Sequence, residues 1–197
     1  MISIIIRNKN EAQFIGFTLQ SCLDFFGKPE IIVLDNKSTD DSMDVVQNFN
    51  NRTNIIVKNI NKYKPGEAIN KGVKFATNDY ILVLSGHTQI IKLDLDSIKK
   101  NLDKHKAVFG QQIPVHRGKK VTPGYIWTNF GDKEEINKFS KIENRLFLHN
   151  AFCFYKKETL LKYPMPENYS GKEDRYWAKD IINKYLTMIK NDCNIED

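Results

Sequence analysis

The sequence contains few cysteines and no long hydrophobic run. Its 197 residues include only three cysteines, Cys22, Cys153 and Cys193, which are widely spaced and form no Cys-x-x-Cys pair. This pattern argues against a disulfide framework and a cysteine-based zinc site. The apolar opening Ile2–Ile6 ends at Arg7 and is too short for a signal peptide or a membrane-spanning helix. We therefore expect a cytoplasmic protein with reduced, structural thiols.

The chain also lacks a linker and an internal repeat. No stretch rich in Gly, Ser or Pro divides it into two halves. Hydrophobic residues make up 41% of the sequence, which is enough for one substantial core at this length. We expect a single domain.

The charge is basic, with a net charge of +6 and a pI near 9.1. Such a balance suits nucleic acid, an anionic membrane face or a phosphorylated small substrate. The lysines are scattered among asparagines, and no zinc-finger, RNP or homeodomain pattern accompanies them. These observations disfavour a nucleic-acid partner.

Short apolar runs alternate with amphipathic segments in the first half of the chain. This alternation is typical of an α/β fold with a mostly parallel sheet flanked by helices. The predicted strands are Ile2–Ile6, Glu30–Leu34, Asn54–Val57 and Tyr80–Leu84.

Helix start and stop signals lie between these strands. We expect Asn10 to cap the first helix, with Gln13 in the reciprocal capping-box position and Gly27 at its end. A second helix is predicted to start at Ser38, and a third at Pro65, a good first helical residue.

The alternation is lost after residue 105. We expect a strand near Ala107–Ile113, an irregular stretch to about Lys141 that shapes a site, and a strand near Leu146–Tyr155. Lys156–Leu161 predicts a short helix, and Glu173–Ile189 a longer one. Residues on the predicted inner face of the longer helix are Trp177, Ile181, Ile182, Tyr185 and Ile189.

Polar motifs follow three of the predicted strands, at Arg7–Glu11, Asp35–Asp40 and Ser85–His87. Ligands of open parallel sheets bind outside the carboxyl ends of the strands. An acid there can accept hydrogen bonds from a nucleobase or a ribose, and lysines nearby can meet phosphate. The alternative for Asp35, a simple turn residue, stays open on this evidence.

Three segments together, Ser3–Glu11, Glu30–Asp40 and Pro65–Gly72, resemble family 2 glycosyltransferases of the GT-A (Rossmann-like) fold. The resemblance extends from residue 2 to about residue 180. It implies one GT-A domain over 1–197, with a nucleotide-sugar-binding half at 1–113 and an acceptor-binding half at 114–197. The implied nucleotide and diphosphate residues are Arg7, Asn10, Glu11, Asp35, Lys64, Asn70, Lys71 and Ser85.

The metal motif of that family is altered in this chain. Ser85-Gly86-His87 stands where the family usually has an Asp-x-Asp-like element, and it resembles the Ser-x-His variant of a rhamnosyltransferase-like branch. His87 is thus a candidate ligand for a divalent metal (Mn²⁺ or Mg²⁺) or for phosphate, with a structural histidine as the alternative. Without a metal, Lys62, Lys64 and Lys71 would have to stabilise the negative charge of the leaving group.

A second motif near the C-terminus, Ser170–Trp177, resembles the family's Glu-Asp motif at a helix start. An alcohol that attacks an anomeric carbon needs a carboxylate as general base. We expect Asp174 in that role, with Glu173 as second choice; the alternative is favourable charge for the helix dipole. Candidate acceptor-binding residues are His149, Asn150 and Trp177. Gln112, His116 and Arg117 suit either an anionic ligand or a solvated loop.

The resemblance implies an inverting transferase in bacterial surface glycan synthesis. Its expected partners are a nucleoside-diphosphate sugar and a saccharide or lipid-linked saccharide, with the basic surface suited to the inner membrane leaflet. A sugar nucleotidyltransferase is one alternative, but the loop at Arg7–Glu11 lacks that class's glycines. A non-catalytic nucleotide-sugar-binding subunit is the other.

Overall fold

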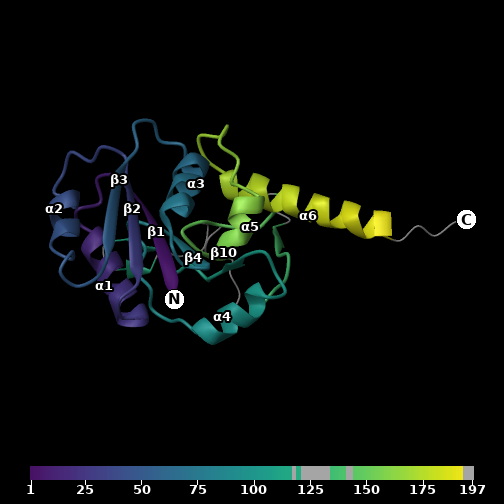
Figure 1. The fold of residues 1–197 in the computed structure, drawn as a ribbon, viewed down its shortest axis with the longest axis horizontal. Coiled ribbons are helices and arrows are strands. Elements are labelled where there is room, and N and C mark those ends of the chain that lie inside the picture. The colour runs from purple at the N-terminus through teal and green to yellow at the C-terminus, as the bar shows by residue number, and fades with distance from the viewer. Residues whose placement is uncertain (117–118, 121–133, 141–143, 193–197) are drawn as a thin grey trace, which may run out of the picture.

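A six-stranded sheet lies at the centre of the fold, in the order β3-β2-β1-β4-β10-β5 (Figure 1). The computed structural model describes residues 1–116, 119–120, 134–140 and 144–192. Strands β1 to β4 run parallel, and β10 is antiparallel to both of its neighbours. The strands are β1 (Ile2–Asn8), β2 (Glu30–Asp35), β3 (Ile55–Asn59), β4 (Tyr80–Ser85), β5 (Val108–Phe109) and β10 (Phe152–Lys156).

Helices cover both faces of this sheet, which confirms the predicted α/β fold with a mostly parallel sheet. Helices α1, α2 and α4 share a core with side chains such as Ile4 and Ile6, and α3, α5 and α6 share the opposite core with side chains such as Ile5. Burial on both faces explains why β1 is an unbroken apolar run. The helices are α1 (Ile15–Phe26), α2 (Ser42–Gln47), α3 (Pro65–Phe75), α4 (Leu95–Leu102), α5 (Lys157–Lys162) and α6 (Glu173–Asp192).

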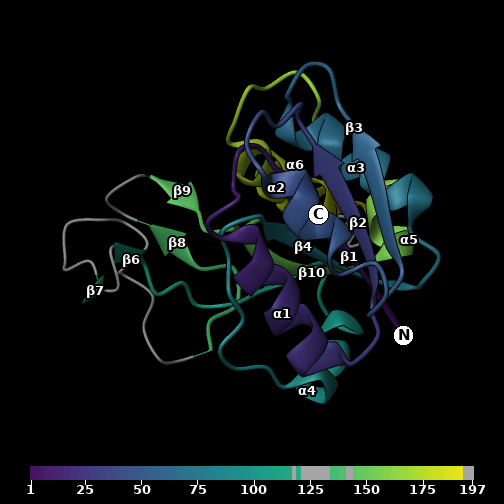
Figure 2. The ribbon, with the colours of Figure 1, turned by 90° about the vertical axis from the view of Figure 1, so that its left-hand side faces the viewer.

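The second half of the chain is less regular than the first. Two short ribbons, β6–β7 (Val115–His116 with Lys119–Lys120) and β8–β9 (Phe139–Ser140 with Arg145–Leu146), lie to one side of the central sheet (Figure 2). The predicted single strand over 146–155 was wrong: it divides into β9 and β10. The residues between them are not in a strand, and one of them, Asn150, bonds to Arg7 of β1 and to Glu173 of α6.

Two helix starts differ from the sequence prediction. Asn10 adopts a left-handed φ of 53°, and its side-chain oxygen accepts a hydrogen bond from Thr39 N at 2.8 Å. Helix α1 therefore starts only at Ile15 and has no side-chain cap. Ser38 likewise bonds to Asp35 instead of capping, and α2 starts at Ser42. Asn10 and Ser38, the two predicted caps, instead form hydrogen bonds that join the loop after β1 to the loop after β2.

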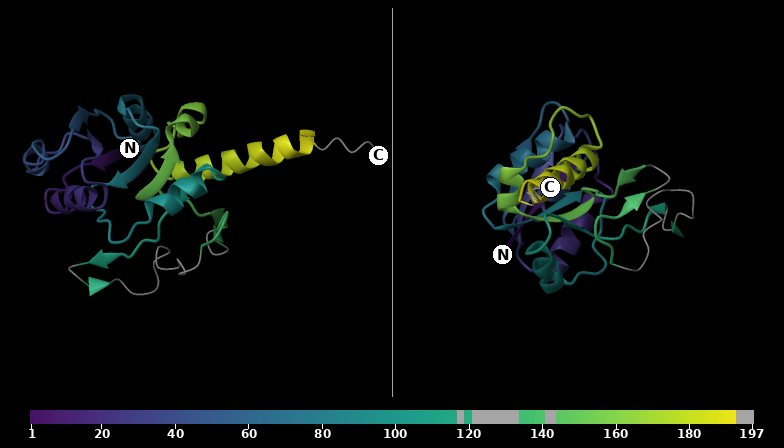
Figure 3. Two further views of the ribbon diagram at one scale, coloured as in Figure 1. Left: turned by 60° about the horizontal axis from the view of Figure 1, so that its bottom comes forward. Right: turned by 90° about the vertical axis from the view of Figure 1, so that its right-hand side faces the viewer.

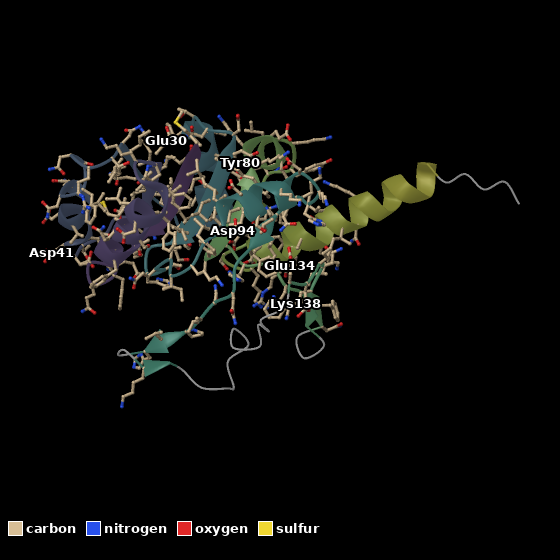
Figure 4. All side chains as sticks on the ribbon, turned by 90° about the horizontal axis from the view of Figure 1, so that it is seen from below. Glu30, Asp41, Tyr80, Asp94, Glu134 and Lys138 are labelled. Carbon is tan, nitrogen blue, oxygen red and sulfur yellow. The ribbon has the colours of Figure 1, made fainter. Side chains whose placement is uncertain are left out.

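The other helix boundaries behave as predicted, with one addition. Gly27, at a φ of 72°, ends α1, and Pro65 begins α3. Helix α4 was not predicted because it is short and mostly polar. Its signal was Asp94, whose carboxylate accepts a hydrogen bond from Ser97 N at 3.0 Å. Asp94 is marked in Figure 4, as are Glu30 and Tyr80, the first residues of β2 and β4.

Helix α6 projects away from the rest of the molecule (Figures 1 and 3). Trp177 and Ala178 are buried near its start and Ile181 packs against the same core, as the inward face predicted. The side chains of Tyr185 and Ile189 lie outside the described set. Across the described residues, no helix is both long and apolar enough to cross a membrane.

Gly66 provides a test of the packing between α3 and the segment before α6. A Cβ atom at Gly66 would collide with the carbonyl oxygen of Pro166, whereas one at Gly171 would meet nothing within 4 Å. We expect Gly66→Ala to lower the free energy of unfolding by about 1–3 kcal/mol. Denaturant titration measures the change, with Gly171→Ala as the matched control. Equal stability of the two variants would contradict the packing described.

Candidate functional site

The site lies at the carboxyl ends of β1, β2 and β4. The strand register places Arg7 beside Ser85 and Asn8 beside Asp35. The sheet order changes direction here, because β2 and β3 continue on one side of β1 while β4 lies on the other. Parallel sheets bind ligands at such switch points.

A first cavity of about 210 Å³ opens at this point. Four of its lining residues, Arg7, Glu11, Ser85 and His87, were candidates from the sequence. The full lining consists of Arg7, Asn8, Lys9, Glu11, Asn36, Tyr63, Ser85 and His87.

Gly86 lets the β4 loop approach β1 closely. A Cβ atom there would lie 2.9 Å from Asn8 Oδ1 and 3.2 Å from the Arg7 carbonyl oxygen. Its backbone N–H also donates to the Arg7 carbonyl at 3.0 Å. A side chain between Ser85 and His87 would therefore crowd both the Asn8 side chain and the backbone of Arg7.

Asp35 lies below the cavity and does not line it. The residue is only 2% exposed, and its carboxylate accepts hydrogen bonds from Ser38 N (2.9 Å), Ser38 Oγ (2.6 Å) and Asn8 Nδ2 (3.0 Å). Ser38 Oγ in turn accepts from Asn10 N at 2.9 Å. Asp35 therefore holds the two strand-end loops in place, while its neighbour Asn36 reaches the cavity.

His87 and Glu11 form a pair at the cavity. His87 Nδ1 lies 2.8 Å from Glu11 Oε1, and the imidazole is 57% exposed. When Nδ1 donates its proton to the carboxylate, Nε2 is left as an acceptor, which is the usual arrangement of a metal-binding histidine. The described residues contain no cluster of three or more His, Cys, Asp or Glu suited to a metal. The pair fits a metal only if a bound ligand completes the coordination.

Arg7 connects this cavity to a second one. Its guanidinium donates to Ser85 Oγ at 3.2 Å and to the Asn150 carbonyl at 2.8 Å, and it pairs with Glu173 Oε1 at 3.3 Å. Its buried Nε has no hydrogen-bond partner within the described residues. One side chain therefore joins β1, β4, the segment before β10 and α6.

The second cavity, of about 170 Å³, lies at the start of α6. It brings together the predicted residues Asp174 and His149. Three cationic side chains share it. Its lining consists of Arg145, Phe147, Leu148, His149, Lys172, Asp174 and Arg175.

The two acids at the start of α6 have different surroundings. Glu173 is only 4% exposed and binds Arg7 and Asn150 Nδ2 (3.1 Å). Asp174 faces the cavity and accepts hydrogen bonds from Arg175 N (2.8 Å) and Asn150 N (3.3 Å). Burial, and then the negative charge of Glu173, raise the pKa of Asp174. Such a carboxylate holds a proton more tightly than an exposed one.

His149 and Asn150 support the cavity from its floor. Burial lowers the pKa of His149 to about 4, helped by the charges of Arg145 and Arg7, so the imidazole is neutral at pH 7. Its Nε2 lies 3.0 Å from the Gly110 carbonyl, and its Nδ1 lies 2.9 Å from Gln112 Nε2. Asn150 is buried and accepts a hydrogen bond from Tyr155 OH at 2.6 Å.

Several predicted site residues line neither cavity. Asn70 bonds to both backbone groups of Met165, and Lys71 donates to the Asn59 carbonyl at 2.9 Å. Trp177 is 4% exposed and donates to the Tyr163 carbonyl at 2.7 Å.

Asn10 and Lys64 are also absent from both linings, as are Lys62 and His116, while Arg117 lies outside the described residues. Gln112 is in neither described lining but bonds to His149, which lines the second cavity.

Sequence reasoning missed Lys9, Asn36 and Tyr63 in the first cavity. Lys9 and Asn36 lie inside the strand-end motifs, so position gave a signal that could have found them. Lys172 and Arg175, in the second cavity, likewise lie inside the Ser170–Trp177 motif, whereas nothing local marked Tyr63 or Arg145.

Comparison with known proteins identifies relatives of this chain. The model of Glycosyl transferase family 2 matches residues 3–163. The "Dolichyl N-acetyl-alpha-D-glucosaminyl phosphate 3-beta-D-2,3-diacetamido-2,3-dideoxy-beta-D-glucuronosyltransferase" of Methanococcus voltae is 31% identical over 54% of this chain and 34% of its own length. The "Poly-beta-1,6-N-acetyl-D-glucosamine synthase" of Staphylococcus epidermidis is 28% identical over 95% of this chain and 44% of its own. The chain thus spans less than half the length of these relatives.

Solved structures with the same fold include the complex of Staphylococcus aureus TarS 1-349 with UDP-GlcNAc. It has a TM-score of 0.66 and 22% identity, and it covers 90% of this chain and 52% of its own. The mannosyltransferase PcManGT from Pyrobaculum calidifontis, in complex with GDP-Man and Mn²⁺, has a TM-score of 0.60 and 15% identity, with 91% and 51% coverage. The expected GT-A fold is therefore confirmed.

The raised pKa of Asp174 predicts a stability cost at neutral pH. A carboxyl whose pKa is higher in the folded state contributes stability below its unfolded pKa, and this contribution is lost as the pH rises through the folded value. We expect Asp174→Asn to melt at or above the wild-type temperature at pH 7, and to lose that advantage near pH 4, about the ordinary pKa. Asp180→Asn, on an exposed position of α6, is the control in the same thermal melts. A lower melting temperature for Asp174→Asn at pH 7 would contradict the sign.

Proposed function

Because the chain belongs to glycosyl transferase family 2, we propose that it transfers a sugar from a nucleoside diphosphate to a hydroxyl acceptor with inversion. The observation that carries this proposal is the junction at Arg7. A cavity with strand-end polar groups lies on one side of that side chain, and the half-buried carboxylate of Asp174, which is suited to general base catalysis, lies on the other.

The donor is assigned to the first cavity. Arg7 and Lys9 supply positive charge for the diphosphate, and Asn36 offers an amide that can pair with a nucleobase. Among the described lining residues, Tyr63 is the only aromatic ring apart from His87. Asp35 acts as a positioning residue for these loops through Ser38.

Asp174 acts as the general base in the proposed reaction. Its carboxylate takes the proton of the acceptor hydroxyl, the hydroxyl oxygen forms a bond to the anomeric carbon, and the bond from that carbon to the diphosphate oxygen breaks. The nucleoside diphosphate leaves with the electron pair of that bond. Glu173 is better suited to hold Arg7, because it is buried and already paired. The family model ends before both acids, so this assignment depends on the geometry.

A divalent metal is compatible with the donor cavity. His87 would hold it through Nε2, with Glu11 fixing the ring and the donor diphosphate completing the coordination. When bound, the ion would neutralise charge on the departing diphosphate. The mannosyltransferase neighbour was solved with Mn²⁺, which makes manganese the first metal to test.

Surface glycan synthesis is the proposed setting. The names of the relatives describe the assembly of poly-N-acetylglucosamine and of a dolichyl-linked glycan, and S. aureus TarS is named a poly(ribitol-phosphate) beta-N-acetylglucosaminyltransferase. The acceptors that these names describe differ in their charge and in whether they carry a lipid. The names therefore do not indicate which acceptor this chain uses. Peripheral contact with the inner leaflet and the rhamnosyltransferase-like branch stay predictions.

Donor binding tests the proposal most directly. We expect UDP or GDP to bind the wild-type chain, and Lys9→Gln to weaken that binding about tenfold through loss of one charge-assisted hydrogen bond. Calorimetric titration in Mn²⁺ and in chelator measures both effects. Lys28→Gln, an exposed lysine between α1 and β2 at the amino ends of the parallel strands, is the control. Absence of binding by any nucleoside diphosphate would overturn the proposed function.

The base assignment predicts a pH signature. Asp174→Asn should retain donor affinity and lose about 10²–10⁴-fold in transfer rate. The raised pKa of Asp174 should move the acidic limb of the rate profile above the ordinary aspartate range, because only the ionised form accepts the proton. Glu173→Gln removes a neighbouring negative charge and should shift that limb to lower pH. A limb that does not move in Glu173→Gln would count against Asp174 as the titrating base.

A further inference from the structure

Two tyrosine rings are stacked beside the start of α6. Tyr169, from the loop between α5 and α6 (Figure 1), lies against Tyr176, from the first turn of α6, with 3.8 Å between the ring centroids and 9° between the ring planes. Tyr169 is 38% exposed and Tyr176 is 39% exposed. This tyrosine pair therefore presents aromatic surface to solvent, and nothing in the site described above uses it.

The loop that carries Tyr169 is anchored at both ends. On its amino side, Asn70 of α3 bonds to both backbone groups of Met165, at 2.8 and 2.9 Å. On its carboxyl side, the carbonyl oxygen of Lys172 accepts a hydrogen bond from Tyr176 N at 3.3 Å. These bonds hold the loop on α3 and α6 without help from the rings. A surface fixed in this way loses little conformational entropy when a ligand binds to it.

The contact between the two rings is a weak reason for this geometry. Aromatic pairs prefer offset or edge-to-face arrangements, with centroids about 4.5–7 Å apart, over a face-to-face one. The buried pair of Tyr155 and Trp177 has the preferred form, with centroids 5.4 Å apart and planes at 88°. The exposed tyrosine pair is instead almost parallel, and among the described residues neither ring has a second aromatic partner. Stacking covers one face of each ring and leaves aromatic surface for another partner.

The tyrosine pair adjoins the wall of the second cavity. Lys172, which lies one turn before Tyr176 by the hydrogen bond above, lines that cavity, and so does Asp174, two residues before Tyr176. One helical turn spans about 5.4 Å, which is comparable to the length of a sugar ring. A saccharide with one unit in front of Asp174 therefore has its next units within reach of the rings.

We propose that the tyrosine pair is a second subsite for the acceptor, which binds a sugar ring at least one unit away from the hydroxyl that Asp174 deprotonates. The C–H face of a sugar ring is apolar and slightly positive, whereas the face of a phenol ring is negative, so the two surfaces attract each other and exclude water. The inference rests on the proposed function for the role of the saccharide as acceptor. The subsite selects an oligosaccharide over a single sugar, because only a longer acceptor reaches both groups.

Saccharide binding can be measured without any donor. The probes are the β-1,6-linked tetrasaccharide of N-acetylglucosamine, which matches the polymer named for the S. epidermidis relative, the corresponding tetrasaccharide of glucose, and methyl β-glucoside as the single sugar. Ring signals of the chain labelled with ¹³C-tyrosine are followed by NMR during titration. We expect at least one tetrasaccharide to shift the signals of Tyr169 and Tyr176 to saturation, and the single sugar to bind about tenfold more weakly.

Ring variants test whether the aromatic surface is responsible. Tyr169→Leu keeps apolar volume without a ring, and Tyr176→Ala removes the other ring. Each should weaken tetrasaccharide binding about tenfold, the loss expected for one aromatic contact. Tyr176→Phe keeps the ring and should bind like wild type. Phe17→Ala, which removes a 63% exposed ring from α1, is the matched control.

Unshifted signals of Tyr169 and Tyr176 with both tetrasaccharides would overturn the proposal. Wild-type affinity in Tyr169→Leu and Tyr176→Ala would do so as well, and lower melting temperatures of those variants would then assign the stack to stability alone. A single sugar that binds as tightly as the tetrasaccharides would also contradict the second subsite.

The outcome is separable from that of the donor titration. UDP or GDP should bind the tyrosine variants as tightly as wild type, because other residues line the first cavity. Saccharide binding at the tyrosine pair in a chain that binds no nucleoside diphosphate would leave the subsite standing and remove the proposed function. Nucleotide binding without any saccharide response at these rings would do the reverse.

Discussion

The site depends on one buried guanidinium. Arg7 ends the apolar run of β1, and its side chain binds Ser85 from β4, the carbonyl of Asn150 and the carboxylate of Glu173 from α6. Glu173 lies 166 residues along the chain from Arg7. A buried charge of this kind is tolerated only when it is paired and hydrogen-bonded, so these partners cannot be separated cheaply. The two cavities therefore keep a fixed relation to each other.

Several features of this arrangement cost folding free energy. Glu173 and Asp174 are adjacent acids with little access to water, and the charge of Glu173 disfavours ionisation of Asp174. Arg7 compensates Glu173 directly and Asp174 at longer range. Left-handed backbone at Asn10 and Lys172 adds local strain beside the two cavities. Such costs are typical of active sites, where the surrounding fold holds groups in arrangements that they would not adopt alone.

The candidate site was predicted in outline and revised in detail. Strand ends are recognisable in sequence, because a buried strand must end where the polar residues begin. Four residues chosen in this way, Arg7, Glu11, Ser85 and His87, line one cavity. The choice between Asp35 and Asn36 could not be made in the same way. Neighbouring residues at a strand end point in different directions, and only the fold shows that the amide faces the cavity while the acid bonds to Ser38.

By itself, the sequence determined the α/β fold, the approximate positions of β1 to β4, the start of α3 and the acidic start of α6, since these follow from periodicity, caps and glycine or proline signals read over a few residues. The tertiary structure alone decided that Asn70 and Trp177 serve packing, and that Arg145 lines the same cavity as Asp174. The physical reason is that hydrogen-bond partners and cavity walls come from segments distant in the chain. Their meeting depends on how the helices pack on the sheet, which no local pattern encodes.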